Sequence, residues 1–119
     1  MKYLMMIRHA ESYRSQQIPQ ALMDAMGEFV STSTAAGVLK DTAGLKPSEA
    51  GFRVRSSGGK LTMTDGPFTE TKEVVGGYAI VEATSDEHAR AVARRFMELH
   101  RLHWPEFDGE CEVRPVEDM

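Results

Sequence analysis

Five stretches of this chain are continuously apolar or alternate between apolar and polar residues, as β-strands do. Residues 2–9 are short, apolar and bounded by polar residues, which predicts a buried strand. Residues 52–65 alternate clearly on both sides of a Ser-Ser-Gly-Gly turn and predict a hairpin. The remaining strands are expected over residues 38–45, 74–83 and 110–114.

Two further stretches carry apolar residues at the spacing of an α-helix. The first, residues 19–37, begins at Pro19, which suits a first helical turn. The second follows Ser85, a typical N-cap residue with acidic residues after it, and Pro105 stops it. The order strand, helix, strand, hairpin, strand, helix, strand predicts an α+β fold in one domain, residues 1–119. It is a ferredoxin-like βαββαβ sandwich with an inserted β-hairpin.

The expected strands over residues 2–9 and 74–83 are apolar on both faces. Two helices cover only one face of such a sheet, so the second face needs another cover. A second copy of the sheet is the simplest one, and we therefore expect a homodimer. The alternative is a sheet covered by the chain's own hairpin and C-terminal tail.

Composition excludes several classes of function. A net charge of -4 argues against a nucleic-acid partner, which requires a basic surface. One cysteine, Cys111, cannot form an internal disulfide, which favours a reducing compartment. The apolar run at residues 3–7 is too short for a signal-peptide core or a membrane span. We expect a cytoplasmic protein with no membrane partner.

Residues 64–78 contain most of the candidate chemistry. Asp65 suits a base or an anchor, and Gly66 allows close backbone approach. Gly76 and Gly77 remove side-chain bulk from a strand and leave room for a ligand, although they also suit a bulge or a dimer contact. Arg8 and Lys72 would attract an anionic group, while His9 and Tyr78 would assist proton transfer or orientation. The catalytic candidates are Asp65 and His9, and the ligand-binding candidates are Arg8, Gly66, Phe68, Lys72, Gly77 and Tyr78.

The same segment, Thr-Asp-Gly-Pro-Phe-Thr-Glu-Thr-Lys-Glu-Val-Val-Gly-Gly-Tyr, resembles the signature of the YCII-related family in its DGPF type. Residues 1–7, 35–39 and 113–116 also resemble that family. The resemblance implies a ferredoxin-like fold that dimerises through its sheets into a dimeric α/β barrel. It also implies an uncharacterised activity in a cleft near the DGPF loop, residues 65–68. The family's suspected catalytic histidine lies in the first helix, whereas residues 19–37 contain no histidine.

Two functions remain open at this point. The leading one is binding of a small molecule near the DGPF loop, with weak acid/base activity as an option. The alternative is a non-catalytic regulatory or interaction module, because DGPF-type relatives are associated with extracytoplasmic-function sigma factors.

Two other motifs are less specific. Residues 6–12 resemble the Arg-His-Gly-Glu-Ser motif of histidine phosphatases, which makes phosphoryl transfer at Arg8 and His9 a further alternative. The chain is short for that fold, and Ala10 replaces the usual glycine. His100 and His103 have the spacing of metal ligands, but no convincing cluster completes a site. We therefore expect neither a metal nor a cofactor.

Overall fold

The structure is a computed structural model, and it describes residues 1–10, 12, 17–68 and 73–117. Within these residues the chain forms an α+β fold of two α-helices and six strands in two antiparallel sheets. In chain order the elements are β1 (Lys2–His9), α1 (Gln20–Ala35), β2 (Leu39–Gly44), a 3-10 turn (Ser48–Ala50), β3 (Phe52–Ser57), β4 (Lys60–Asp65), β5 (Val74–Glu82), α2 (Asp86–His103) and β6 (Gly109–Pro115).

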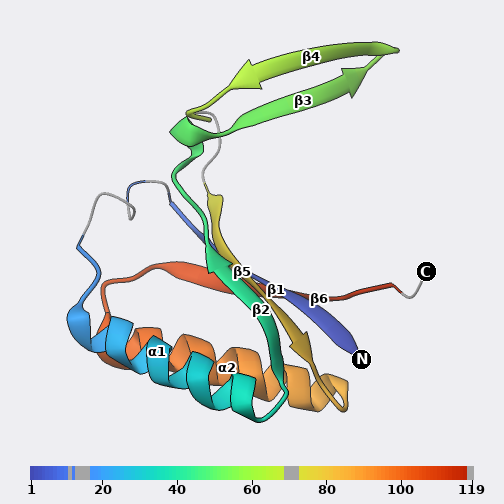
Figure 1. Ribbon diagram of the computed structural model, residues 1–119. Helices are drawn as coiled ribbons and strands as arrows, with labels where there is room; N and C mark the ends of the chain where they lie inside the picture. The colour runs from blue at the N-terminus through green and yellow to red at the C-terminus, as the bar shows by residue number, and fades with distance from the viewer. Residues whose placement is uncertain (11, 13–16, 69–72, 118–119) are drawn as a thin grey trace.

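Four strands form the main sheet in the order β2-β5-β1-β6. Helices α1 and α2 lie side by side on one face of this sheet (Figure 1). The strand order and the two helices are compatible with the predicted ferredoxin-like fold, in which the hairpin β3–β4 is inserted between β2 and β5. The predicted bounds of β1 and of the hairpin are confirmed.

Side chains alternate across the central strand β1, as the pleat of a strand requires. Tyr3, Met5 and His9 are buried on the helix side of the sheet, with exposed fractions of 2%, 5% and 6%. Leu4 and Met6 are half-buried on the opposite side, which we call the open face. The core on the helix side comprises Tyr3, Met5, Leu39, Val81, Ala83 and Ala89.

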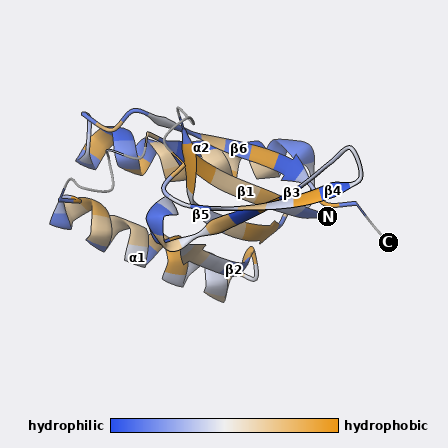
Figure 2. Cartoon of the chain, turned by 90° about the horizontal axis from the view of Figure 1, so that it is seen from above, coloured by the Kyte–Doolittle hydropathy of each residue, from blue (hydrophilic) through white to orange (hydrophobic). Residues whose placement is uncertain are grey.

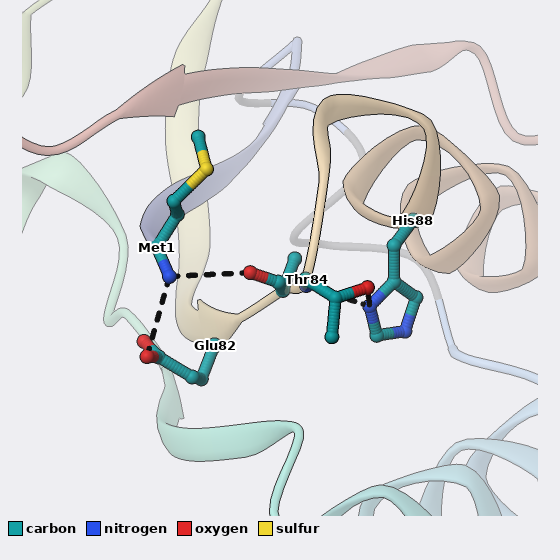
Figure 3. Close-up of polar contacts among 5 residues, drawn as sticks. Met1, Glu82, Thr84 and His88 are labelled. Carbon is teal, nitrogen blue, oxygen red and sulfur yellow. Dashed lines mark hydrogen bonds and ion pairs between the residues drawn. The ribbon is translucent and has the colours of Figure 1, made fainter.

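Hydrogen bonds hold the start of β1 close to the start of α2. Ser85 is the N-cap of α2, as predicted, because its Oγ accepts a hydrogen bond from the backbone N–H of His88 at 3.0 Å. The backbone N–H of Thr84 donates to Nδ1 of His88 at 3.1 Å (Figure 3). The N-terminal ammonium of Met1 donates to the carboxylate of Glu82 at 3.3 Å, so the end of β5 is joined to the start of β1 (Figure 3).

Strands β3 and β4 pair with each other in a separate two-stranded sheet, which we call the arm. Gly58 and Gly59 form its turn with φ of 59° and 77°, a region that glycine enters without strain. The arm stands off the main sheet on the side away from the helices (Figure 1). The Cα radius of gyration is 16.0 Å, above the roughly 13.5 Å expected of a compact chain of this length.

One face of the arm is apolar and exposed. Directly opposed residues of antiparallel strands share a face, which places Val54 and Met63 together, with Phe52 and Leu61 beside them. Their exposed fractions are 54%, 67%, 64% and 71% respectively. Figure 2 accordingly shows hydrophobic residues on the arm as well as on the helix–sheet body.

Two features differ from the sequence predictions. The last strand was expected to end before Pro115, but Pro115 pairs with Tyr3 inside β6. Strand β6 lies at an edge of the sheet, where a missing backbone N–H is tolerated. The 3-10 turn (Ser48–Ala50) was not predicted, because the surrounding segment has no regular apolar pattern.

Candidate functional site

A cavity of about 490 Å³ lies between the main sheet and the two helices. Its lining includes Met5 and Ile7 of β1, Leu22 and Met26 of α1, and Phe96 of α2. None of the described lining residues is a lysine, an arginine, an aspartate or a glutamate. The cavity therefore presents an apolar surface, of the size at which proteins commonly enclose small ligands.

Glycines form part of the lining of this cavity. Gly44 of β2 pairs directly with Gly77 of β5, and both line the cavity. A Cβ placed on Gly77 would lie 3.0 Å from the carbonyl oxygen of Ala43 and 3.3 Å from a methyl group of Ile7, so the space directly beside Gly77 is occupied. A Cβ on Gly44 would meet no atom within 4 Å. Gly27 of α1 also lines the cavity and is equally unobstructed.

His9 is held at the end of β1 by its close fit against a bulge. Between Ile7 and Arg8 the pairing of β1 with β5 shifts by one residue, at Gly76. A Cβ on Gly76 would overlap the imidazole of His9, so only glycine leaves room for the ring in this position. Nδ1 of His9 lies 2.8 Å from the carbonyl oxygen of Ala10, to which it can only donate. The ring lines the cavity.

An aromatic wall closes the same end of the cavity. The His100 ring packs against Phe96 and Phe107 at centroid distances of 4.8 Å and 4.9 Å. Phe107 in turn contacts Trp104 at 5.3 Å and His9 at 6.0 Å. These separations suit tilted and edge-to-face aromatic pairs. All five rings line the cavity.

Burial shifts the pKa values of two lining residues, His100 and Cys111. His100 is only 7% exposed, and burial lowers the pKa of its imidazole, which favours the neutral ring. Its Nδ1 lies 3.1 Å from the carbonyl oxygen of Phe96, to which it donates. Burial raises the pKa of the Cys111 thiol to about 11, so this group stays protonated at neutral pH and is a poor nucleophile.

The DGPF loop packs against the 3-10 turn and not against this cavity. The backbone N–H of Gly66 donates to the carbonyl oxygen of Gly51 at 2.9 Å, and that of Phe68 donates to Oγ of Ser48 at 3.1 Å. A Cβ on Gly66 would overlap the carbonyl oxygen of Ser48. The close backbone approach predicted for Gly66 is therefore present. Asp65 lies beside these contacts at the end of β4 and is exposed.

A second hollow of about 500 Å³ lies at the base of the arm. Phe68 lines it, with the guanidinium of Arg53 stacked 3.8 Å from the centre of the Phe68 ring. Lys46 and Glu73 also line it. None of its described lining residues is buried, so this hollow is a surface depression.

Arg8 and Tyr78 belong to the open face. Nη1 of Arg8 donates to the carboxylate of Glu112 at 2.9 Å, and both side chains are about one-third exposed, at 38% and 31%. Tyr78 borders the cavity, but its hydroxyl donates to Oδ2 of Asp41 at 3.0 Å. That hydrogen bond raises the pKa of the Tyr78 phenol. On the open face, Arg8 thus pairs with Glu112, and Tyr78 pairs with Asp41.

The structure thus separates the residues that the sequence grouped as one site. His9 and Gly77 line the helix–sheet cavity, and Tyr78 borders it. The DGPF-loop candidates Asp65, Gly66 and Phe68 lie at the base of the arm, and Arg8 lies on the open face. Lys72 lies outside the described residues.

Sequence reasoning missed several cavity residues, among them Gly27, Gly44, Thr42 and Phe107. A glycine inside helix α1, where it lowers helix stability, was a usable signal for Gly27. No pattern in the sequence marked Phe107, because it follows the helix in an irregular segment.

The remaining motifs do not assemble a site within the described residues. Arg8 and His9 are neighbours on one strand and therefore point to opposite faces of the sheet. His100 and His103 lie on α2, and no group of three His, Cys, Asp or Glu side chains in the described part of the chain could hold a metal ion. Neither described helix is long and apolar enough to cross a membrane.

Comparisons with known proteins agree with the resemblance seen in the sequence. The chain matches the family model described as "YCII-related domain" over residues 1–101. It is also 35% identical over 81 residues to "Uncharacterized protein R00369" of Rhizobium meliloti (strain 1021). That match covers 68% of this chain and 61% of the relative, so the chain spans less than two thirds of the relative's length. Because the family model covers most of the chain, the protein belongs to the YCII-related family.

Proposed function

We propose that this protein binds a small molecule in the cavity between the main sheet and the helices, and that it does so as a homodimer. The observation that supports binding most strongly is a cavity of about 490 Å³ with a mainly apolar lining, in which Gly44 meets no atom where a Cβ would stand. Unfilled apolar space costs stability, since its lining atoms lose their packing contacts. A ligand that fills the space recovers those contacts.

The helix–sheet cavity is a better candidate than the cleft expected near the DGPF loop. Small-molecule sites usually bury most of the ligand surface. The lining of the hollow beside Phe68 includes no buried residue among those described, whereas the lining of the helix–sheet cavity includes buried residues such as Met5, Leu22 and Val81. The DGPF loop then has a packing role, since Gly66 and Phe68 attach it to the 3-10 turn.

The proposal is of binding and not of catalysis. The expected pair of catalytic residues is split within one chain, because His9 lines the cavity and Asp65 lies on the arm. Arg8, the expected anchor for an anion, pairs with Glu112 on the open face. A phosphoryl-transfer reaction at His9 would require cationic groups around the histidine, and none of the described lining residues supplies one.

The homodimer is supported by two uncovered apolar surfaces. Leu4, Met6 and Ile80 lie half-buried on the open face of the main sheet. The arm adds an apolar face whose four large side chains, led by Leu61 and Met63, are each more than half exposed. Contiguous apolar surfaces of this kind are typical of interfaces. Packing two open faces together would form the dimeric α/β barrel that the family resemblance implies.

A second candidate function is an interaction module that serves a sigma factor. The exposed apolar face of the arm favours it, since a strand pair presented in this way can bind another protein instead of a second copy. The two candidates differ in what occupies the cavity. The interaction module requires no cavity ligand, whereas the proposed function does.

The test is a thermal-shift screen of uncharged ring compounds against the wild type and three variants. Gly44→Leu fills open space in the helix–sheet cavity, and Gly51→Leu places the same side chain in the hollow beside Phe68. Asp65→Ala removes the candidate base. We expect compounds that raise the melting temperature of the wild type, of Gly51→Leu and of Asp65→Ala, but not of Gly44→Leu. Loss of the shift in Gly51→Leu or in Asp65→Ala alone would place the site at the DGPF loop instead.

Light scattering at micromolar concentration tests the homodimer. The chain has a mass of 13.2 kDa, so the proposal requires about twice that mass. The double variant Leu61→Ser/Met63→Ser should lower the mass toward that of one chain, because it removes two large apolar side chains from the exposed face of the arm. A wild-type mass of one chain would contradict the proposal.

A further inference from the structure

The helix–sheet cavity has a chemical character that narrows what it can bind. Among the described lining residues it carries no lysine, arginine, aspartate or glutamate. Transfer of a charged ligand into such an environment is costly unless an opposite charge or several hydrogen bonds compensate it. The Cys111 thiol adds no charge, since its pKa is raised to about 11. These features favour an uncharged ligand.

The aromatic wall beside α2 favours a ligand that contains an aromatic ring. Phe96, His100 and Phe107 form a continuous run of rings with centroid separations of 4.8 Å and 4.9 Å, and Phe29 extends it at 5.9 Å from Phe96. Aromatic rings gain additional free energy from edge-to-face and offset contacts with another ring, beyond the burial of area alone. An aromatic ligand can continue this series of contacts into the cavity.

One lining atom remains available to orient such a ligand. Nδ1 of His100 donates to the carbonyl oxygen of Phe96, so the neutral ring has its lone pair on Nε2. Within the described residues, no hydrogen-bond donor is placed at that Nε2 atom. A ligand that enters the cavity can therefore donate a hydrogen bond to this atom.

We propose that the helix–sheet cavity binds an uncharged aromatic molecule with one hydrogen-bond donor, which donates to Nε2 of His100. This inference rests on the proposed function, because it specifies the ligand of the same cavity. It also differs from the sequence-based expectation of an anionic ligand held by Arg8 and Lys72, since Arg8 lies on the other face of the sheet.

Three naphthalene derivatives of similar size test the inference: 1-naphthol, 1-methoxynaphthalene and 1-naphthoate. The first is an uncharged donor, the second keeps the oxygen but has no donor, and the third is an anion at neutral pH. Trp104 lines the cavity and is the chain's one tryptophan, so its indole N–H gives a single cross-peak in a ¹H–¹⁵N spectrum. Titration of that cross-peak reports binding in the cavity.

We expect 1-naphthol to bind about fivefold to tenfold more tightly than 1-methoxynaphthalene, the usual effect of one hydrogen bond. The anion should bind at least about tenfold more weakly than 1-naphthol, because no described cation lines the cavity. In His100→Phe, which keeps a ring beside Phe96 but has no acceptor, 1-naphthol and 1-methoxynaphthalene should bind equally. In His103→Phe, a control on the same helix outside the cavity lining, the preference for 1-naphthol should remain.

The outcomes separate this inference from the proposed function. Equal binding of 1-naphthol and 1-methoxynaphthalene to the wild type would overturn the inference while the cavity still binds ligands. That comparison needs no variant, so it holds even where His100→Phe does not fold. Tighter binding of 1-naphthoate would also overturn the inference, in favour of an anion site. If none of the three compounds moves the Trp104 cross-peak, the inference fails together with the proposed function.

Discussion

The helix–sheet cavity and the DGPF loop of the arm differ in how the sequence forms them. The cavity is lined by residues far apart in the sequence, from Met5 to Cys111, and open space remains beside Gly27 and Gly44. The DGPF loop is a continuous motif, and its Gly66 is needed because the space beside it is already occupied by Ser48. A conspicuous motif therefore marks tight packing in this chain, while the candidate site comes from dispersed, less conspicuous residues.

The largest expected difference between the two regions concerns packing. Leu22 is 1% exposed and lines the cavity, whereas Leu61 on the arm is 71% exposed. Leu22→Ala should lower the free energy of unfolding by about 2–5 kcal/mol. Leu61→Ala should change it by no more than about 0.5 kcal/mol. Urea denaturation of dilute protein measures both, and similar losses would show that the arm belongs to the core.

A second comparison concerns two glycines that line the same cavity. In Gly76→Ala the new methyl group collides with the imidazole of His9, so we expect a loss of about 1–3 kcal/mol. Gly44→Ala places its methyl group in open space and should change stability by less than about 0.5 kcal/mol. Equal effects in urea denaturation would mean that the bulge does not hold His9 in place.

A third comparison concerns the DGPF loop itself. Gly66→Ala forces a methyl group against the backbone of Ser48 and should cost about 1–2 kcal/mol. Gly66 lines neither the helix–sheet cavity nor the hollow at the base of the arm. The affinity for a ligand in the helix–sheet cavity should therefore stay within about twofold of the wild type. Titration of the Trp104 cross-peak with 1-naphthol measures this affinity. A large loss of affinity would connect the loop to the binding site.

The smallest effect is a pH dependence that arises from His100. Burial lowers the pKa of this imidazole in the folded chain below the ordinary value of 6.5. Between the two pKa values the unfolded state binds more protons, so stability is lost as the pH falls below about 6.5. Above that pH both states are neutral at this position and the effect is absent.

The variant His100→Phe should lose this part of the pH dependence, whereas His103→Phe should keep it. Denaturation of the wild type and the two variants across pH 5 to 8 measures the difference. Parallel curves for the wild type and His100→Phe would show that the histidine titrates normally in the folded chain.

Much of the fold followed from the sequence, because local patterns determine local elements. Ser85 could be recognised as a helix cap, and the alternation over residues 52–65 predicted the hairpin. The candidate site was less accessible to prediction. Asp65, His9 and Arg8 were grouped by residue type, but the pleat separates Arg8 from His9, and the arm carries Asp65 away from both. Such separations depend on tertiary geometry that no single segment encodes.

The Gly76-Gly77 pair was one part of the candidate site that the sequence did indicate. Its lack of side chains was visible in the sequence, and the suggested bulge is present. Gly76 lies at a bulge beneath His9, and Gly77 is part of the cavity lining.

The most direct test of the account is to locate bound 1-naphthol by intermolecular nuclear Overhauser effects to methyl groups. Cavity methyls such as those of Leu22, Met26 and Val81 are well separated along the chain from the arm methyls of Leu61 and Met63. We predict contacts from the naphthol protons to the first set and none to the second. Contacts to Leu61 and Met63 without contacts to Leu22 and Val81 would place binding on the arm and contradict the account.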